Sequence, residues 1–104
     1  MFRGTTPTYV FNLSDQTVDL TTASKVFVTF ARKDGSEILT KAGDELDVSA
    51  HSVSVFLTQE ETLAFPTGQV NMQLNWLYEE SGKTKRACTK ISADYIHTDL
   101  WADC

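Results

Sequence analysis

The stretch that decides the fold is residues 69–79, with the sequence QVNMQLNWLYE. Large apolar residues occupy every second position of it, and mostly polar residues lie between them. The apolar set is Val70, Met72, Leu74, Trp76 and Tyr78. A period of two is typical of a strand with one buried face, because successive side chains point to opposite sides. At about 3.3 Å per residue the stretch spans about 36 Å, so we expect it to run through the middle of a sheet.

The flanking residues predict further strands. Residues 80–83, ESGK, are typical of a hairpin turn, and residues 84–93 are expected to return as a partner strand, with Cys88 and Ile91 among its less polar positions. Alternation upstream predicts five more strands, at residues 7–13, 25–32, 37–41, 46–48 and 52–57. The Asp-Gly pair in residues 33–36 predicts a hairpin, because glycine accepts the positive φ of a tight turn.

One short helix is expected near residues 58–64. Thr58 and Glu61 have the spacing of a capping box, in which each side chain binds the backbone amide of the other residue. Pro66 and Gly68 should end the helix. We expect this helix to form a corner between two sheets.

Together these elements predict an all-β fold, a two-sheet immunoglobulin-like β-sandwich of about seven strands, although a small barrel fits the same pattern. The length of 104 residues suits a single domain over residues 1–104, with residues 94–104 as a C-terminal tail. Hydrophobic residues make up 41% of the chain, which is enough for a core without metal or disulfide bonds.

Charge and hydropathy narrow the expected partners. Fourteen acidic and nine basic residues give a net charge of −5, which disfavours nucleic acid and anionic membrane surfaces. No apolar run approaches the roughly 18 residues of a membrane span. The opening residues 1–6 are not followed by an apolar segment, so we expect no signal peptide and a protein that stays in the cytoplasm or leaves by another route.

Catalytic and cofactor motifs are absent from the sequence. It contains no nucleophile elbow, phosphate loop, Cys-x-x-Cys or His-Glu-x-x-His pattern, so we expect no catalytic residue, cofactor or metal. Three groups resemble sites only loosely. We interpret His51, with Ser52 and Ser54, as a turn histidine, and Asp44, Glu45 and Asp47 as a hydrated acidic turn. The third group, His97, Asp99, Asp103 and Cys104, is interpreted as part of a solvated tail.

Two further features are assigned by position. Lys83, Lys85 and Arg86 cluster at the last hairpin together with residue 90, also a lysine; they are candidates for contacting an acidic partner, or for protecting a sheet edge. Cys88 is expected as a small residue at or near the core, and no structural disulfide with the last residue is expected.

A resemblance adds to this reading. The opening RGTTPT at residues 3–8, followed by an alternating strand, and LTQEETL at residues 57–63 resemble small uncharacterised prophage proteins of Gram-positive gut bacteria. The likeness extends from Arg3 to about Ile91. Those proteins are similar in plan to the N-terminal domain of phage baseplate upper proteins, a β-sandwich docking module. The resemblance implies no catalytic residue.

The leading hypothesis is therefore a non-enzymatic, phage-derived structural or assembly module of a tail or baseplate. It would contact copies of itself, as a homo-oligomer, or other phage structural proteins, in the host cytoplasm during assembly and then in the virion. The alternative is a ligand-binding module, for example one that binds carbohydrate by stacking on aromatic rings. The candidate rings for that alternative are Trp76, Tyr78, Tyr95 and Trp101.

The tail carries a separate prediction. Residues 94–104 include Tyr95, Ile96, Leu100 and Trp101, which is more apolar content than an idle solvated end needs. We expect Tyr95 and Ile96 to pack at the end of the last strand. Leu100 and Trp101 are expected either to cover a sandwich edge or to dock on another copy, because aromatic anchors dominate protein interfaces.

Overall fold

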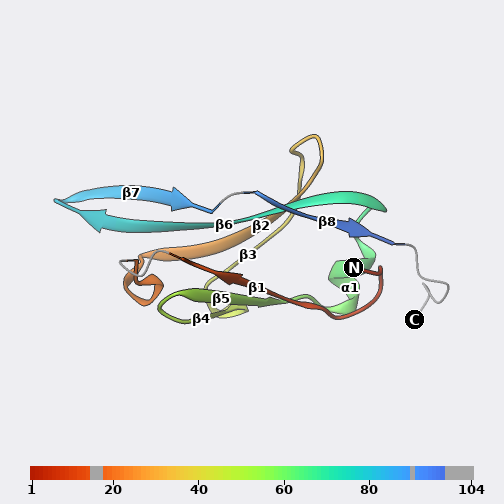
Figure 1. Ribbon diagram of the computed structural model, residues 1–104, viewed down its shortest axis with the longest axis horizontal. Helices are drawn as coiled ribbons and strands as arrows, with labels where there is room; N and C mark the ends of the chain where they lie inside the picture. Colours follow the sequence, from red (N-terminus) through yellow and green to blue (C-terminus); the bar gives the residue numbers. More distant parts are fainter. Residues whose placement is uncertain (15–17, 90, 98–104) are drawn as a thin grey trace.

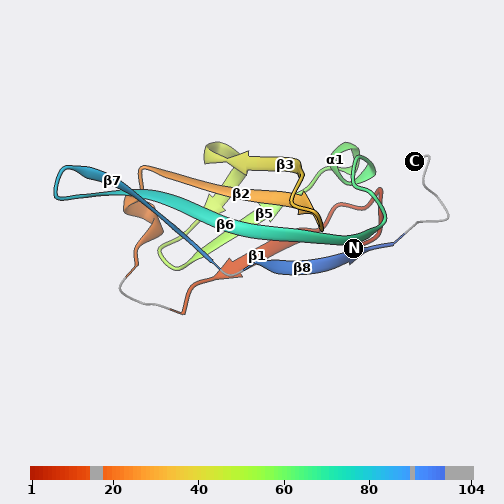
Figure 2. The ribbon, with the colours of Figure 1, turned by 90° about the horizontal axis from the view of Figure 1, so that it is seen from above.

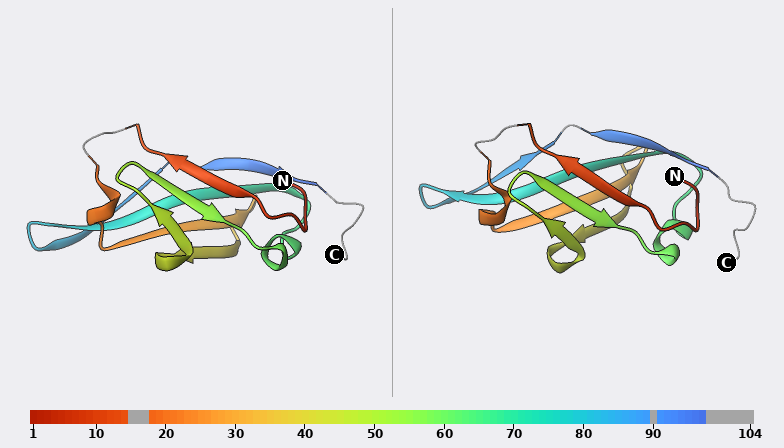
Figure 3. Two further views of the ribbon diagram at one scale, coloured as in Figure 1. Left: turned by 90° about the horizontal axis from the view of Figure 1, so that it is seen from below. Right: turned by 60° about the horizontal axis from the view of Figure 1, so that its bottom comes forward.

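The computed structural model describes residues 1–14, 18–89 and 91–97, which form two antiparallel sheets packed face to face (Figure 1). The smaller sheet has the order β1-β5-β4, from β1 (Thr8–Asn12), β5 (Ser52–Phe56) and β4 (Leu46–Val48). Figure 3 views this sheet from its outer side. The larger sheet has the order β3-β2-β6-β7, from β3 (Glu37–Ala42), β2 (Lys25–Arg32), β6 (Gly68–Glu80) and β7 (Lys83–Cys88).

β6 is the central strand, as the alternation of residues 69–79 predicts. It pairs with β2 on one side, and on the other side first with β8 (Ser92–Ile96) and then with β7. The β6–β7 hairpin extends past the end of the smaller sheet (Figure 1). Its two-residue turn, Ser81 and Gly82, has φ angles of 53° and 73°, and two positive φ angles are typical of the turns that match the strand twist.

Three details differ from the expected elements. Residues 84–93 do not form one strand, because pairing with β6 is interrupted at Thr89 and resumes at Ser92. The Thr89 hydroxyl accepts a hydrogen bond from the Leu74 amide at 3.2 Å, so the interruption leaves that donor satisfied. β8 also takes up the start of the expected tail, so the described residues contain eight strands where about seven were expected. The immunoglobulin-like connectivity is not confirmed by these strand orders.

The core lies between the two sheets, on the inner faces that alternation predicts. Its most deeply buried side chains, all at most 1% exposed, are Leu20, Val28, Phe30, Val53, Val55, Leu57, Phe65, Val70, Leu74 and Ile96. Short 3₁₀ turns (Leu20–Thr22 and Gly43–Glu45) complete the connections. None of the helices in the described part of the chain is long and apolar enough to cross a membrane.

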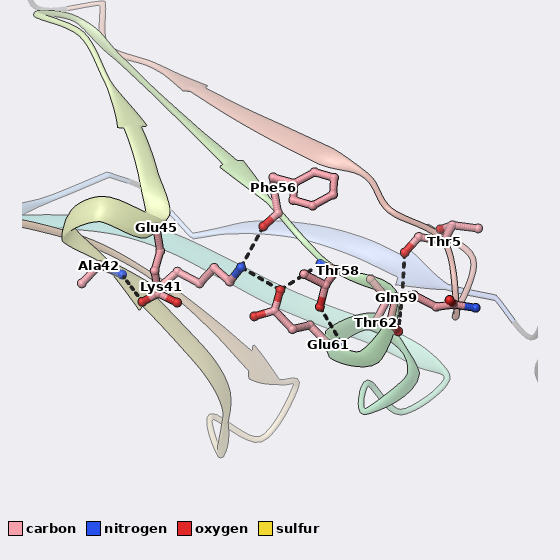
Figure 4. A network of polar contacts seen from close by, with 9 residues as sticks. All are labelled: Thr5, Lys41, Ala42, Glu45, Phe56, Thr58, Gln59, Glu61 and Thr62. Atoms are coloured by element: carbon pink, nitrogen blue, oxygen red, sulfur yellow. Dashed lines mark hydrogen bonds and ion pairs between the residues drawn. The ribbon is translucent and has the colours of Figure 1, made fainter. Parts of the chain in front are cut away.

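The short helix α1 (Gln59–Leu63) is capped as predicted and is tied to the edge strand β3 (Figure 4). The Thr58 amide donates to the Glu61 carboxylate at 2.8 Å, and the Glu61 amide donates to the Thr58 hydroxyl at 3.3 Å. The same carboxylate pairs with Lys41 Nζ at 2.7 Å, and Lys41 also donates to the Phe56 carbonyl at 2.9 Å. Lys41 therefore points inward from β3 and joins it to β5 and α1.

Candidate protein interaction surface

The predicted basic cluster lies on β7 and is exposed. Strand alternation places Lys83 and Lys85 on one face of the hairpin and Arg86 on the other. Lys85 Nζ lies 3.5 Å from a Glu80 carboxylate oxygen, in a pair whose side chains are both about half exposed. Such a pair contributes only about 0–1 kcal/mol. The structure thus brings these cations to one edge strand without focusing all three on one ligand.

The predicted anchors Leu100 and Trp101 lie outside the described residues, as do residue 90, Asp99, Asp103 and Cys104. Their predicted contacts therefore remain predictions. Of the tail residues that the structure describes, Ile96 is fully buried, whereas Tyr95 is 57% exposed. Packing at the end of the last strand is thus confirmed for Ile96, and for Tyr95 it is wrong because strand alternation turns its side chain outward.

Among the residues that the structure describes, the candidate aromatic rings do not form a flat binding platform; Trp101 lies outside them. Trp76 is only 8% exposed and Tyr78 is half-buried, since both continue the inner face of β6. Tyr95 packs on His97, with ring centroids 4.8 Å apart and the planes tilted by 51°. Phe2 contacts the same imidazole at 5.0 Å and 35°. Phe2, Tyr95 and His97 form an exposed patch that sequence analysis missed.

That patch exists because residues 1–3 add to the free side of β8. Phe2 and His97 form a parallel bridge, in which the Arg3 amide donates to the His97 carbonyl at 3.0 Å and the His97 amide donates to the Met1 carbonyl at 2.8 Å. Parallel pairing between residues 1–3 and the end of β8, which lie far apart along the chain, leaves no local pattern in the sequence. No signal in the sequence could have identified it.

A carboxylate links the two sheets beside this patch. The Tyr9 hydroxyl of β1 donates to Asp94 of β8 at 2.6 Å, and the Met1 amino group lies 3.2 Å from the same oxygen. Burial raises the pKa of Asp94, but the hydrogen bonds from Tyr9 and from the amino group outweigh it and hold that pKa below its usual value. Burial, and then the adjacent carboxylate, raises the pKa of Tyr9 well above its ordinary value. The interaction stabilises the contact between β1 and β8.

Further along the same side, the sandwich opens into a groove between β1 and the interruption that separates β7 from β8. Its lining combines the apolar Val10, Phe11, Leu13, Val18, Trp76 and Ala87 with the polar Asn12, Ser14, Thr89 and Ser92. Figure 2 shows β1 and β8 along one long side of the molecule and β3 along the opposite side. Cys88 lines the groove and is exposed. The prediction of a core or near-core cysteine is wrong, because Ala87 takes the inward position opposite Trp76.

The residues considered for catalysis are not arranged for it. The Ser52 hydroxyl lies 2.5 Å from the Ser49 hydroxyl, and His51 Nδ1 has no hydrogen-bond partner among the described residues. A nucleophile needs a base within hydrogen-bond distance, and His51 and Ser52 do not form such a pair. Over residues 1–14, 18–89 and 91–97, no three His, Cys, Asp or Glu side chains are grouped so that they could hold a metal ion.

Comparison with known proteins gives no match to a family model, a curated protein or a solved structure.

Proposed function

We propose that the chain is a non-enzymatic, phage-derived structural or assembly module, a component of a tail or baseplate that acts through protein–protein contacts. The observation that carries this proposal is the open side of the sandwich. The edge strand β1 and a groove run along this side, with the aromatic patch near the Gly68 end of β6 and the basic hairpin at its Glu80 end. The origin from a phage rests on the resemblance of residues 3–8 and 57–63 alone.

The chemistry of this side suits a protein partner better than a small ligand. Val10, Phe2 and Tyr95 are each more than half exposed, and such side chains gain stability when a partner covers them. The net charge of −5 opposes nucleic acid and anionic membrane. The tilted rings and the buried Trp76 do not favour the carbohydrate-binding alternative.

The proposal is tested on phage particles. The prophage in the genome that encodes the chain is induced, particles are purified by density gradient, and their proteins are identified by mass spectrometry. We expect the chain to copurify with tail or baseplate proteins in fixed proportion, and its gene to be flanked by capsid and tail genes. Particles that lack the chain, or flanking genes for metabolic enzymes, would refute the proposal.

A further inference from the structure

The edges of the two sheets differ in how they are protected from pairing with another chain. β3 has an irregular register with β2 and carries the inward-pointing Lys41, and β4 has only three residues. Residues 1–3 cover the C-terminal end of β8, at Tyr95 and the following His97. β7 carries Lys83, Lys85 and Arg86. Charges, irregular registers, short strands and covering segments are the known means of protecting an edge, and over residues 1–14, 18–89 and 91–97 β1, with the sequence TYVFN, has none of them.

The free edge of β1 presents backbone groups in a regular order. The Leu13 amide donates to the His51 carbonyl at 2.7 Å, so this pair is hydrogen-bonded toward β5. In antiparallel strands the residues alternate between those that bond to a given neighbour and those that do not. The residues of β1 whose backbone groups face away from β5 are therefore Thr8, Val10 and Asn12. In the described part of the chain, β1 pairs with no other strand on that side.

We propose that β1 pairs with β1 of a second copy, antiparallel and about a twofold axis, with Val10 opposite Val10 of the partner subunit. In this register Thr8 lies opposite Asn12 of the partner subunit, and the reverse. The backbone amide and carbonyl groups of Thr8, Val10 and Asn12 all point away from β5. Each opposed pair therefore exchanges two backbone hydrogen bonds, about six in total. The two smaller sheets become one continuous sheet, β4-β5-β1 followed by the same strands of the partner in reverse order.

A second copy fits this edge for two reasons. The sequence of β1 is self-complementary in this register, because polar Thr8 meets polar Asn12 and the aromatic Tyr9 meets the aromatic Phe11 of the partner subunit. β1 contains no charged residue, so its pairing brings no like charges together, even though each copy carries a net charge of −5. Pairing also covers Val10, which is 56% exposed in the single chain. The inference rests on the proposed function, since it names a partner for the assembly surface.

The test uses charge at the twofold axis. Val10→Lys and Val10→Glu each place two like charges opposite one another, and each should weaken self-association by at least about tenfold. Sedimentation velocity over a range of concentrations measures the association of each variant alone. An equimolar mixture of the two variants pairs lysine with glutamate and should recover the dimer. Recovery also shows that both variants are folded.

Phe56→Lys is the matched control, because Phe56 is 51% exposed on the neighbouring strand β5 but does not lie on the edge. It should leave the dimer intact. The inference is overturned if the wild-type chain is monomeric at all concentrations, if the mixture stays monomeric, or if Phe56→Lys disrupts association as strongly as Val10→Lys. A monomeric wild-type chain that is nevertheless present in particles would refute the self-pairing and leave the proposed function standing.

Discussion

Replacing Glu61 by alanine tests whether the Lys41–Glu61 pair secures the edge strand β3. Lys41 is 8% exposed at its side chain and has two acceptors, Glu61 Oε1 at 2.7 Å and the Phe56 carbonyl at 2.9 Å. The substitution leaves a buried ammonium with one neutral partner and also removes the acceptor for the Thr58 amide. Breaking a fully buried pair costs about 3–5 kcal/mol. Because Glu61 is 22% exposed, we expect a loss of about 2–4 kcal/mol in the free energy of unfolding.

Urea unfolding at neutral pH, followed by circular dichroism, measures this loss. Glu60→Ala is the matched control, since Glu60 is an exposed neighbour in the same helical turn and its replacement should cost less than about 0.5 kcal/mol. Lys41→Met leaves the Glu61 carboxylate without its cationic partner and the Phe56 carbonyl without a donor, so it should also destabilise, by about 1–3 kcal/mol, because Glu61 is partly exposed and keeps the Thr58 amide. If Glu61→Ala costs no more than Glu60→Ala, solvent screens the pair and the reasoning is wrong.

The same pair predicts a dependence on pH. Partial burial raises the pKa of Glu61, but hydrogen bonds from Lys41 and Thr58 outweigh it, and the net pKa is lowered. A carboxylate with a lower pKa in the folded state stabilises the fold above its unfolded pKa and loses that contribution as pH falls through the folded pKa. The difference in stability between wild type and Glu61→Gln should therefore be full at neutral pH and should shrink in acid, below the ordinary pKa of glutamate.

Two further substitutions test single contacts. Thr62 is fully buried, accepts from the Gly4 amide at 3.0 Å and donates to the Thr5 carbonyl at 2.8 Å; Thr62→Val should cost about 1–3 kcal/mol in urea unfolding and Thr62→Ser clearly less. In a Cys104→Ser variant, the exposed Cys88 should react with a thiol reagent in native buffer about as completely as in denaturant. Protection of Cys88 in native buffer would contradict its exposure.

Most of the fold could be predicted because short-range sequence patterns determine most of its strands, its turns and its helix cap. The alternation of residues 69–79 predicted the central strand, and the Thr58–Glu61 spacing predicted both hydrogen bonds of the helix cap. The interruption at Thr89 was missed because a side-chain hydroxyl replaces a backbone partner there, and propensity does not report such substitutions.

The candidate surface was harder to predict because it depends on which edges meet. Lys41 reads as an ordinary polar position in an alternating strand, and only the approach of α1 makes it a buried partner of Glu61. The patch of Phe2, Tyr95 and His97 likewise needs the parallel bridge to β8. The exposure of Lys83, Lys85 and Arg86 was predictable, since the turn that follows β6 is a local signal.

The position of β6 between β2 and the pair β7 and β8 has a consequence for the kinetics of folding. The β2–β3 and β6–β7 hairpins are local and can form within about 1–10 μs. The larger sheet, however, assembles only when β2 pairs with β6, whose residues lie far along the chain, from Arg32 opposite Val70 to Lys25 opposite Leu77. The pairing of β1 with β5 is also non-local, since Val10 lies opposite Ser54. Such non-local pairing typically slows folding to milliseconds or seconds. During that interval β1 and β5, neither of which contains a charged residue, are open to chance encounters between chains that have not yet folded.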